Sequence, residues 1–279
     1  MYKVIFLLSF GLFSITLNAY SDADFDGVDD GNDKCPNTPF SELVDINGCT
    51  IKSLKSPHNF DIIIGASYSE SDYQTLNATD TFATTLQADY YYEAYSLQLS
   101  TSYFSTKGSG YSETGFNDTF VGISYQKEAL ENFSMRFGIG TILPSYQTSL
   151  NNNNIDYTTS LNISYSLQEF SIFGGYSYTF ISDDDTQIIY EDNTTQSFEY
   201  QNTNAINLGV GYYANSDLYL SLSYNKADSI YTNIEDIETL SFYAYYNFDA
   251  HWFSTLSYSY GVSNSASKNY LSLRLGYFF

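Results

Sequence analysis

The sequence predicts an all-β fold: a transmembrane antiparallel up-and-down β-barrel of about twelve strands, preceded by a small module. Segments of about ten residues alternate apolar and polar side chains, which is the length a tilted strand needs to cross a bilayer. Short and long connections between these segments alternate along the chain. Aromatic residues make up 19% of the 279 residues. This content indicates a folded chain, because disordered acidic chains lack aromatic residues.

The charge of the chain limits its partners. It carries 32 acidic and 10 basic side chains, for a formal net charge of −22. Phosphate contacts need clustered Lys and Arg, and the sequence contains no such cluster. We therefore expect no nucleic-acid partner.

The first 19 residues have the pattern of a secretory signal peptide. Lys3 precedes an apolar run over residues 4–13, and Leu17, Asn18 and Ala19 form a small-residue cleavage pattern. The alternative is a retained single-span anchor, but the apolar run is short and has no basic flank on its far side. We expect an exported protein that begins near residue 20.

An acidic loop follows, with the sequence DADFDGVDDGNDKCP over residues 22–36. Its oxygen donors fall at positions 1, 3, 5, 7, 9 and 12 of a twelve-residue calcium loop, with Gly27 at position 6, where the backbone must turn sharply. A solvated acidic linker is the alternative, although a linker does not require glycine at that position. The predicted calcium ligands are Asp22, Asp24, Asp26, Asp30 and Asp33 through their side chains and Val28 through its carbonyl.

The only two cysteines, Cys35 and Cys49, close the segment after this loop. An even pair in an exported chain predicts a disulfide and an oxidising compartment. Residues 22–49 together resemble a thrombospondin type 3 repeat, a small calcium-binding module with little hydrophobic core. The resemblance implies that the five aspartates bind calcium and that Cys35 pairs with Cys49, but such repeats usually occur in tandem and this chain has one copy.

The predicted domains are a signal peptide over residues 1–19, the calcium-binding module over 20–51, a linker over 52–59 and the barrel over 60–279. The predicted strands cover residues 60–69, 81–91, 94–104, 116–127, 132–142, 157–167, 170–181, 201–214, 217–226, 237–248, 251–261 and 269–279. In transmembrane barrels the short turns face the periplasm and the long loops face outward, so both barrel termini and the calcium module are expected in the periplasm. The alternative is a secreted sandwich of two sheets, which gives no reason for the alternation of loop lengths.

The last segment, NYLSLRLGYFF, is the clearest of these strands. One face is continuously apolar, and the other is mostly polar or small. It resembles the terminal strand of bacterial outer-membrane β-barrels, in which alternate apolar residues ending in Phe are read by the barrel assembly machinery. The resemblance implies a porin-like barrel in outer-membrane lipid, with an assembly signal formed by Leu275, Tyr277 and Phe279.

The residues predicted to face the barrel interior are mostly Ser, Gly, Asn and Thr. Asp89, Arg136 and Arg274 are the charged candidates among them. The two arginines are expected either to pair with Asp89 as a structural tie or to constrict the lumen and select solutes. The tie is favoured, because a buried charge needs a partner.

The sequence gives little support for an enzyme. Its two histidines, His58 in the linker and His251 at a turn, leave a Ser/His or Asp/His site at the outer rim without a base. A carboxylate site among residues 183–185, 191 and 192 is conceivable, but acidic loops are usually solvated. The first functional hypothesis is a passive pore for small solutes, with acidic outer loops that favour cations. The alternative is a structural or adhesive protein whose plugged barrel anchors the calcium module to a periplasmic or cell-wall partner.

Overall fold

The structure is a computed structural model that describes residues 28, 33–34, 44, 57–71, 78–130, 132–146, 153–189 and 195–279. The chain divides into two units, Met1–Ser56 and Pro57–Phe279. The predicted signal peptide, both cysteines and most of the acidic loop lie outside the described residues. The fold described below is that of the second unit.

The described residues of the second unit form strands and contain no helix. The strands are β1 (His58–Ser71), β2 (Thr79–Tyr92), β3 (Tyr95–Gly108), β4 (Tyr111–Phe116), β5 (Thr119–Leu130), β6 (Phe133–Leu143), β7 (Asp156–Leu167), β8 (Phe170–Phe180), β9 (Thr186–Ile189), β10 (Thr195–Phe198), β11 (Thr203–Tyr213), β12 (Leu218–Ala227), β13 (Ile237–Asn247), β14 (Trp252–Gly261) and β15 (Asn269–Phe278). No helix in the described part of the chain has the length and apolar character needed to span a membrane.

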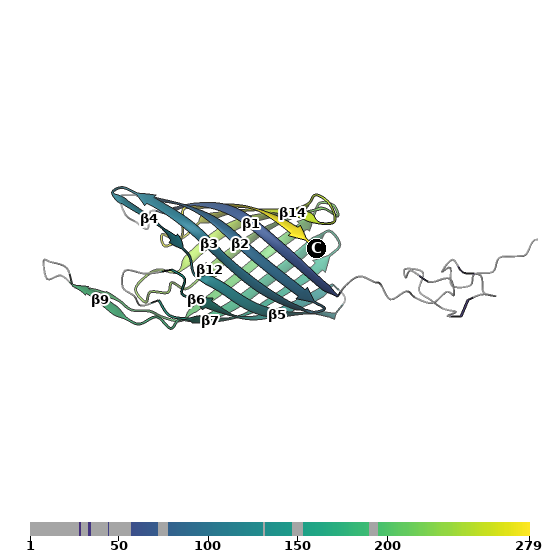
Figure 1. The fold of residues 1–279 in the computed structure, drawn as a ribbon, viewed down its shortest axis with the longest axis horizontal. Helices are drawn as coiled ribbons and strands as arrows, with labels where there is room; N and C mark the ends of the chain where they lie inside the picture. The colour runs from purple at the N-terminus through teal and green to yellow at the C-terminus, as the bar shows by residue number, and fades with distance from the viewer. Residues whose placement is uncertain are drawn as a thin grey trace, which may run out of the picture. The chain divides into compact units, whose positions relative to one another are not determined.

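Twelve of these strands close into an antiparallel barrel. Thirteen strands form one sheet, in which β1 pairs with both β2 and β15, and β2 also pairs with β3. The thirteenth, β4, pairs only with β3 and therefore does not add to the circumference. Figure 1 shows the strands running obliquely around the barrel. Closure leaves no open sheet edge, which is the condition for a sheet in lipid, and it confirms the predicted strand number.

The two faces of the barrel wall have opposite chemistry. On β15, Leu271, Leu273 and Leu275 are between 45% and 59% exposed on the outer face, while Ser272 between them is 4% exposed on the inner face. Among the described residues, the buried apolar side chains are only Phe104, Phe253 and Ala266, and eight buried side chains are polar or charged. A sandwich would bury its apolar faces between two sheets, so the sandwich alternative is wrong.

The strand positions agree with the predicted ones to within a few residues, with two informative differences. β1 begins at His58 and ends at Ser71, against a prediction of 60–69. Residues 105–115, predicted as a loop, are instead the extended end of β3 and the strand β4, joined by a turn in which Gly110 has a φ of +79°. Outside the bilayer, the two strands of a hairpin satisfy each other's backbone hydrogen bonds and need no apolar face. The alternation of apolar and polar residues therefore does not show where such a hairpin ends.

A second hairpin lies in the connection predicted as a loop over residues 182–200. There β9 pairs with β10, from Thr186 opposite Phe198 to Ile189 opposite Thr195. The predicted alternation of connection lengths is confirmed. The short turns lie at the same end of the barrel as the start of β1 and the end of β15, and the long loops lie at the other end (Figure 1).

Candidate functional site

The inner wall of the barrel is the candidate functional site, and strand register determines which residues line it. Asn162 on β7 lies opposite Gly175 on β8, which lies opposite Asn207 on β11. Asn207 in turn lies opposite Asn225 on β12. Because neighbours in register share a face of the sheet, these residues form a polar band around the lumen. The prediction of a lumen lined by small polar residues is confirmed at these positions.

Aromatic side chains on the inner wall lie against glycines of neighbouring strands. A Cβ added at Gly276 would overlap the ring of Phe253, and one at Gly209 would overlap the ring of Phe173. The same relation holds between Phe120 and Gly140 and between Tyr219 and Gly211, while the Phe120 ring also overlaps the Cβ position of Gly122 on its own strand. Each ring occupies the space that a neighbouring side chain would take, so it covers the wall at the position of the glycine.

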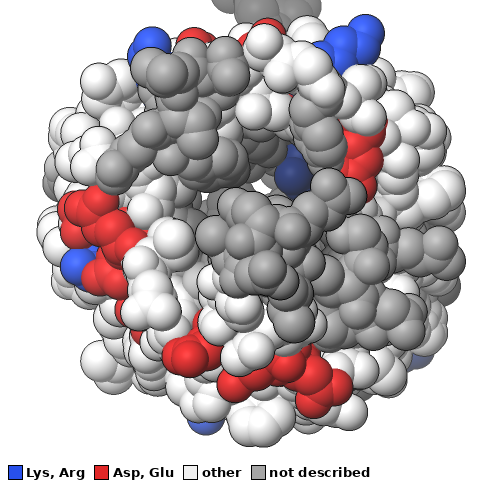
Figure 2. All heavy atoms as spheres, turned by 90° about the vertical axis from the view of Figure 1, so that its left-hand side faces the viewer, with Lys and Arg blue, Asp and Glu red and all other residues white. Residues whose placement is uncertain are grey.

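Three cavities follow the inner wall. The largest, of about 740 Å³, lies at the short-turn end and is lined by residues of β1, β2, β13, β14 and β15. Cavities of about 210 Å³ and 300 Å³ lie against β3 to β7 and against β7 to β13. Viewed from the long-loop end, the molecule is hollowed near its centre, and a basic side chain is visible inside the hollow (Figure 2). The described side chains therefore leave open volume in the barrel.

Asp89 and Arg274 are connected through Gln87 rather than paired directly. The amide nitrogen of Gln87 donates to Oδ2 of Asp89 at 2.7 Å, and Nη1 of Arg274 donates to Oε1 of Gln87 at 3.3 Å. Gln87 therefore separates the carboxylate from the guanidinium. The predicted ion pair between these two residues is wrong, because among the described ion pairs none includes an arginine.

Arg136 is held by hydroxyl groups. Its Nε donates to Oγ of Ser124 and its Nη2 to Oγ of Ser96, both at 2.8 Å, and the two serine hydroxyls lie 2.6 Å apart. The predicted tie from Arg136 to Asp89 is therefore wrong as well. Arg136 lines the 210 Å³ cavity, where its positive charge faces the lumen.

Asp61 is a lumen residue that the sequence analysis missed. It lies directly opposite Asp89 in the register of β1 and β2, so two carboxylates face each other on the inner wall. Asp61 is 9% exposed and Asp89 8%. The hydroxyl of Tyr91 donates to Oδ2 of Asp61 at 3.1 Å, whereas Oδ1 of Asp61 is buried without a hydrogen-bond partner. The alternation of side chains along β1 could have predicted this position, because Asp61 directly precedes Ile62, which faces outward.

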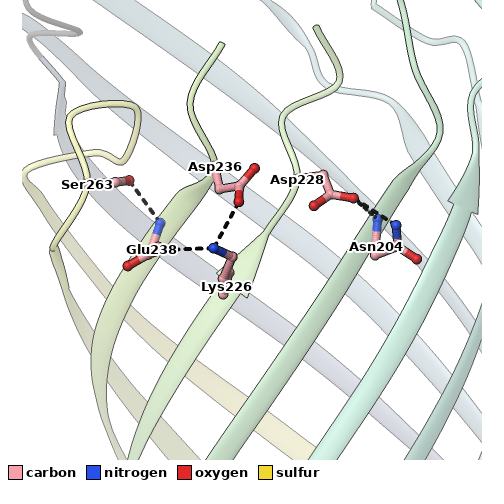
Figure 3. Close-up of polar contacts among 6 residues, drawn as sticks. All are labelled: Asn204, Lys226, Asp228, Asp236, Glu238 and Ser263. Atoms are coloured by element: carbon pink, nitrogen blue, oxygen red, sulfur yellow. Dashed lines mark hydrogen bonds and ion pairs between the residues drawn. The ribbon is translucent and has the colours of Figure 1, made fainter. Parts of the chain in front are cut away.

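Charged residues at the long-loop end tie the strand ends together (Figure 3). Nζ of Lys226 on β12 lies 2.9 Å from Oδ2 of Asp236 and 3.1 Å from Oε1 of Glu238 on β13. Oδ2 of Asp228 accepts two hydrogen bonds from Asn204, one from the backbone and one from the side chain. The side-chain bond and then the backbone bond lower the pKa of Asp228.

The acidic run predicted in the outer loops is bonded to its neighbours. Asp183 accepts from the backbone of Asn154 at 2.7 Å, and Asp185 accepts from the backbone of Tyr200 at 2.8 Å. Carboxylates gather at several places on this end of the barrel (Figure 2). In the same region a hydrogen bond to the carboxylate of Glu113 raises the pKa of Tyr146 to about 12. These carboxylates therefore hold the long loops together through hydrogen bonds. They also place negative charge at this end of the barrel.

Part of the predicted calcium site lies within the described residues, but most of it does not. Val28 and Asp33 are described, whereas Asp22, Asp24, Asp26, Asp30 and the cysteines Cys35 and Cys49 lie outside. Within the described residues, no group of three or more His, Cys, Asp or Glu side chains is placed to hold a metal ion. The calcium ligands and the disulfide remain predictions.

The predicted assembly signal lies on the outer face of β15 and at the residue after it. Leu275 is 47% exposed and Phe279 is 52% exposed. Between them, Tyr277 packs against Trp252 of β14 and against Phe279, with ring centroids 4.8 Å and 5.7 Å apart. All three side chains therefore belong to the outer face, and their recognition by assembly machinery remains a prediction.

Comparison with solved structures identifies the fold. An outer-membrane channel from Pseudomonas putida F1 superposes with a TM-score of 0.67 at 11% identity, covering 81% of this chain and 97% of that one. The NanC porin superposes with a TM-score of 0.49 at 15% identity, covering 78% of this chain and 98% of that one. The translocator domain of the autotransporter NalP from Neisseria meningitidis superposes with a TM-score of 0.49 at 11% identity, covering 82% of this chain and 90% of that one. No protein-family profile and no curated protein matches the sequence.

Proposed function

We propose that this chain, which has the fold of an outer-membrane β-barrel, is a passive pore for small solutes with a mild preference for cations. The observation that carries the proposal is the inner wall. Small polar residues line it, and several of its aromatic rings lie against glycines of the neighbouring strand. The cavities along the wall are consistent with an open path for water and small solutes.

The proposed orientation and location of the barrel are those of transmembrane β-barrels. Transmembrane barrels of this kind place short turns in the periplasm and long loops outside the cell. The barrel would lie in outer-membrane lipid with β1 and β15 ending at the periplasmic side. The carboxylates of the long loops would then stand at the outer entrance, where a narrow low-dielectric mouth concentrates their field and favours cations.

The N-terminal module is the second part of the proposal. Five aspartates and the Val28 carbonyl are hard oxygen donors of the kind calcium takes, so the donor chemistry fits the ion. The ion would offset repulsion between the carboxylates, and the Cys35–Cys49 bridge would add about 3 kcal/mol of stability for a loop of this size. The module would lie in the periplasm, where a cell-wall or protein partner is available.

Single-channel recording on the refolded full-length protein tests the pore. A steady conductance is expected from protein whose gel mobility shows the heat-modifiable shift of a folded barrel. Ser177→Trp on the inner face of β8 should lower the conductance, because Ser177 lines a lumen cavity. Ile172→Trp, on the outer face of the same strand where Ile172 is 48% exposed, is the matched control and should leave it unchanged.

A folded barrel that passes no current would contradict the pore. The alternative would then be a plugged barrel that anchors the calcium module to a partner. No enzymatic role is proposed for the lumen. His251, which lines the largest cavity, stacks on Tyr277 with ring centroids 5.7 Å apart.

A further inference from the structure

The pair formed by Asp61 and Asp89 is unusual because it places two like charges in register on neighbouring strands. Like charges directly opposite each other on a sheet are destabilising, and a buried carboxylate needs a counter-charge or hydrogen bonds. Both side chains are more than nine-tenths buried, and Oδ1 of Asp61 has no hydrogen-bond partner. No described side chain forms an ion pair with either carboxylate, and the positive groups that act on Asp89, Arg136 and Arg274, do so without direct contact.

Arg274 makes no direct ion pair with either carboxylate. Its guanidinium donates to Gln87, whose amide stands between the guanidinium and Asp89. The ion pairs among the described residues involve lysines at other positions. Gln87 therefore bridges Asp89 and Arg274, and the guanidinium makes no ion pair with either carboxylate.

The space beside the pair is large enough for a small molecule. Asp61 and Asp89 line the cavity of about 740 Å³, within the range of roughly 300–1,000 Å³ that ligand pockets occupy. Among its described lining residues, three carboxylates, including Asp249, face one guanidinium, that of Arg274. The cavity therefore carries an excess of negative charge.

The walls of this cavity are aromatic. Tyr91, Tyr243, Tyr245 and Phe253 line it, and the rings of Tyr245 and Phe253 stack with centroids 5.5 Å apart. Aromatic faces attract cations, most strongly where the cation is desolvated. A metal ion would need neither these rings nor this volume, and the described residues hold no group of three metal-ligating side chains.

We infer that Asp61 and Asp89 form a binding site in the lumen for the ammonium group of a small organic solute. The ammonium would donate hydrogen bonds to both carboxylates, and its carbon chain would lie against the tyrosines. The Asp side chain turns easily about its Cβ–Cγ bond, so the free oxygen of Asp61 can turn toward a cation in the cavity. The inference rests on the proposed function only in that solutes must enter the lumen.

Saturation-transfer difference NMR on the refolded full-length protein tests the site without requiring conduction. The probe is ethylammonium chloride, and the neutral probe of similar shape is ethanol. The wild type should transfer saturation to ethylammonium and much less to ethanol. Asp61→Asn and Asp89→Asn should each weaken ethylammonium binding about tenfold, since each removes a charge-assisted hydrogen bond and keeps the shape.

Two further variants make the test specific. Asp80→Asn is the matched control, because Asp80 also accepts a tyrosine hydroxyl, that of Tyr68 at 2.7 Å, but lies on the outer face of the same strands. It should leave binding unchanged. Arg274→Gln removes the guanidinium that lines the cavity, so ethylammonium binding should strengthen by several-fold. This increase stays measurable even if an aspartate variant fails to fold.

The outcomes separate the site from the pore. Equal transfer to ethylammonium and ethanol, or an Asp61→Asn variant that binds as the wild type does, would overturn the site. That result would indicate that the two carboxylates share a proton instead. A barrel that binds ethylammonium but passes no current would overturn the pore and leave the site in place.

Discussion

Phe60 and Phe279 exchange two backbone hydrogen bonds, of 2.8 Å and 3.0 Å, and their rings stack with centroids 5.6 Å apart. Phe60 lies in the first strand of the barrel and Phe279 directly follows the last. The relationship therefore closes the barrel at its short-turn end. It adds lipid-facing aromatic contact to the pairing of β1 with β15.

Phe279→Asp should lower the yield of folded barrel strongly. The change removes the ring stacked on Phe60 and places a charge on the outer face, where charges cost up to a few kcal/mol, least near the interface. The measurement is the fraction of heat-modifiable protein after refolding and in isolated outer membranes. Asn233→Asp in a long loop is the control and should fold as the wild type does. Equal yields for the two variants would show that the last residue has no special part in closure.

The pore should prefer cations because of its loop carboxylates. Replacing Asp183, Asp184 and Asp185 together by Asn keeps acceptors for the loop hydrogen bonds and removes three negative charges. The ratio of potassium to chloride permeability, from reversal potentials in a salt gradient, should fall roughly twofold toward unity. Glu93→Gln, which removes a negative charge at the short-turn end of the barrel, is the control and should change the ratio less. An anion preference in the wild type would instead indicate that Arg136 and Arg274 dominate.

Gly276→Ala should destabilise the barrel and narrow its lumen. The added methyl group overlaps the Phe253 ring, which must leave the wall, and overpacking of this kind costs about 1–3 kcal/mol. Gly174→Ala is the matched control, since its added Cβ meets the nearest atoms at 3.4 Å and 3.6 Å. Denaturant unfolding and single-channel conductance measure both effects. Unchanged conductance and stability in Gly276→Ala would contradict the role given to the ring.

The stability contributed by Asp249 should depend on pH. Its Oδ1 accepts from the backbone nitrogens of Trp252 and His251, both at 2.8 Å, and these bonds lower the pKa of Asp249 below the ordinary value of 3.8. A lowered pKa gives stability that is fully present above 3.8 and is lost as the pH falls through the folded-state pKa. The destabilisation caused by Asp249→Ala should therefore shrink as the pH falls below 3.8.

Asn215 provides a control for this pH effect. Its Oδ1 accepts from the backbone nitrogens of Asp217 and Leu218 at 2.8 Å and 2.9 Å, which is the same turn geometry without a titrating group. The destabilisation caused by Asn215→Ala should be the same across this pH range. Denaturant unfolding at a series of pH values compares the two variants, and parallel curves would contradict the assignment to Asp249.

Calcium should bind the N-terminal module weakly. The loop has Asp33 where strong twelve-residue loops have a bidentate Glu, and no tandem copy shares its ions, so the dissociation constant is expected on the order of 10⁻⁴ to 10⁻³ M. Calorimetry on the oxidised full-length protein measures it, with Asp26→Ala as the variant that should lose the heat. Equal calcium-dependent heats for the two proteins would leave the acidic loop as a spacer.

The sequence alone determined the barrel, its strand number and the direction in which most side chains point. Lipid outside and water inside impose a period of two on every strand. The sequence therefore predicts that Leu271, Leu273 and Leu275 face outward. The alternation of short and long connections is also written along the chain. Both signals are local, and a local signal needs no knowledge of which strands are neighbours.

Only the tertiary structure decided which inward-facing groups meet. The sequence predicted that Arg274 pairs with Asp89, but strand register places Asp61 opposite Asp89 and sets Gln87 between Asp89 and Arg274. Register depends on where each hairpin turns and on how the last strand closes onto the first. It is therefore a property of the whole barrel, and periodicity within one strand carries no record of it.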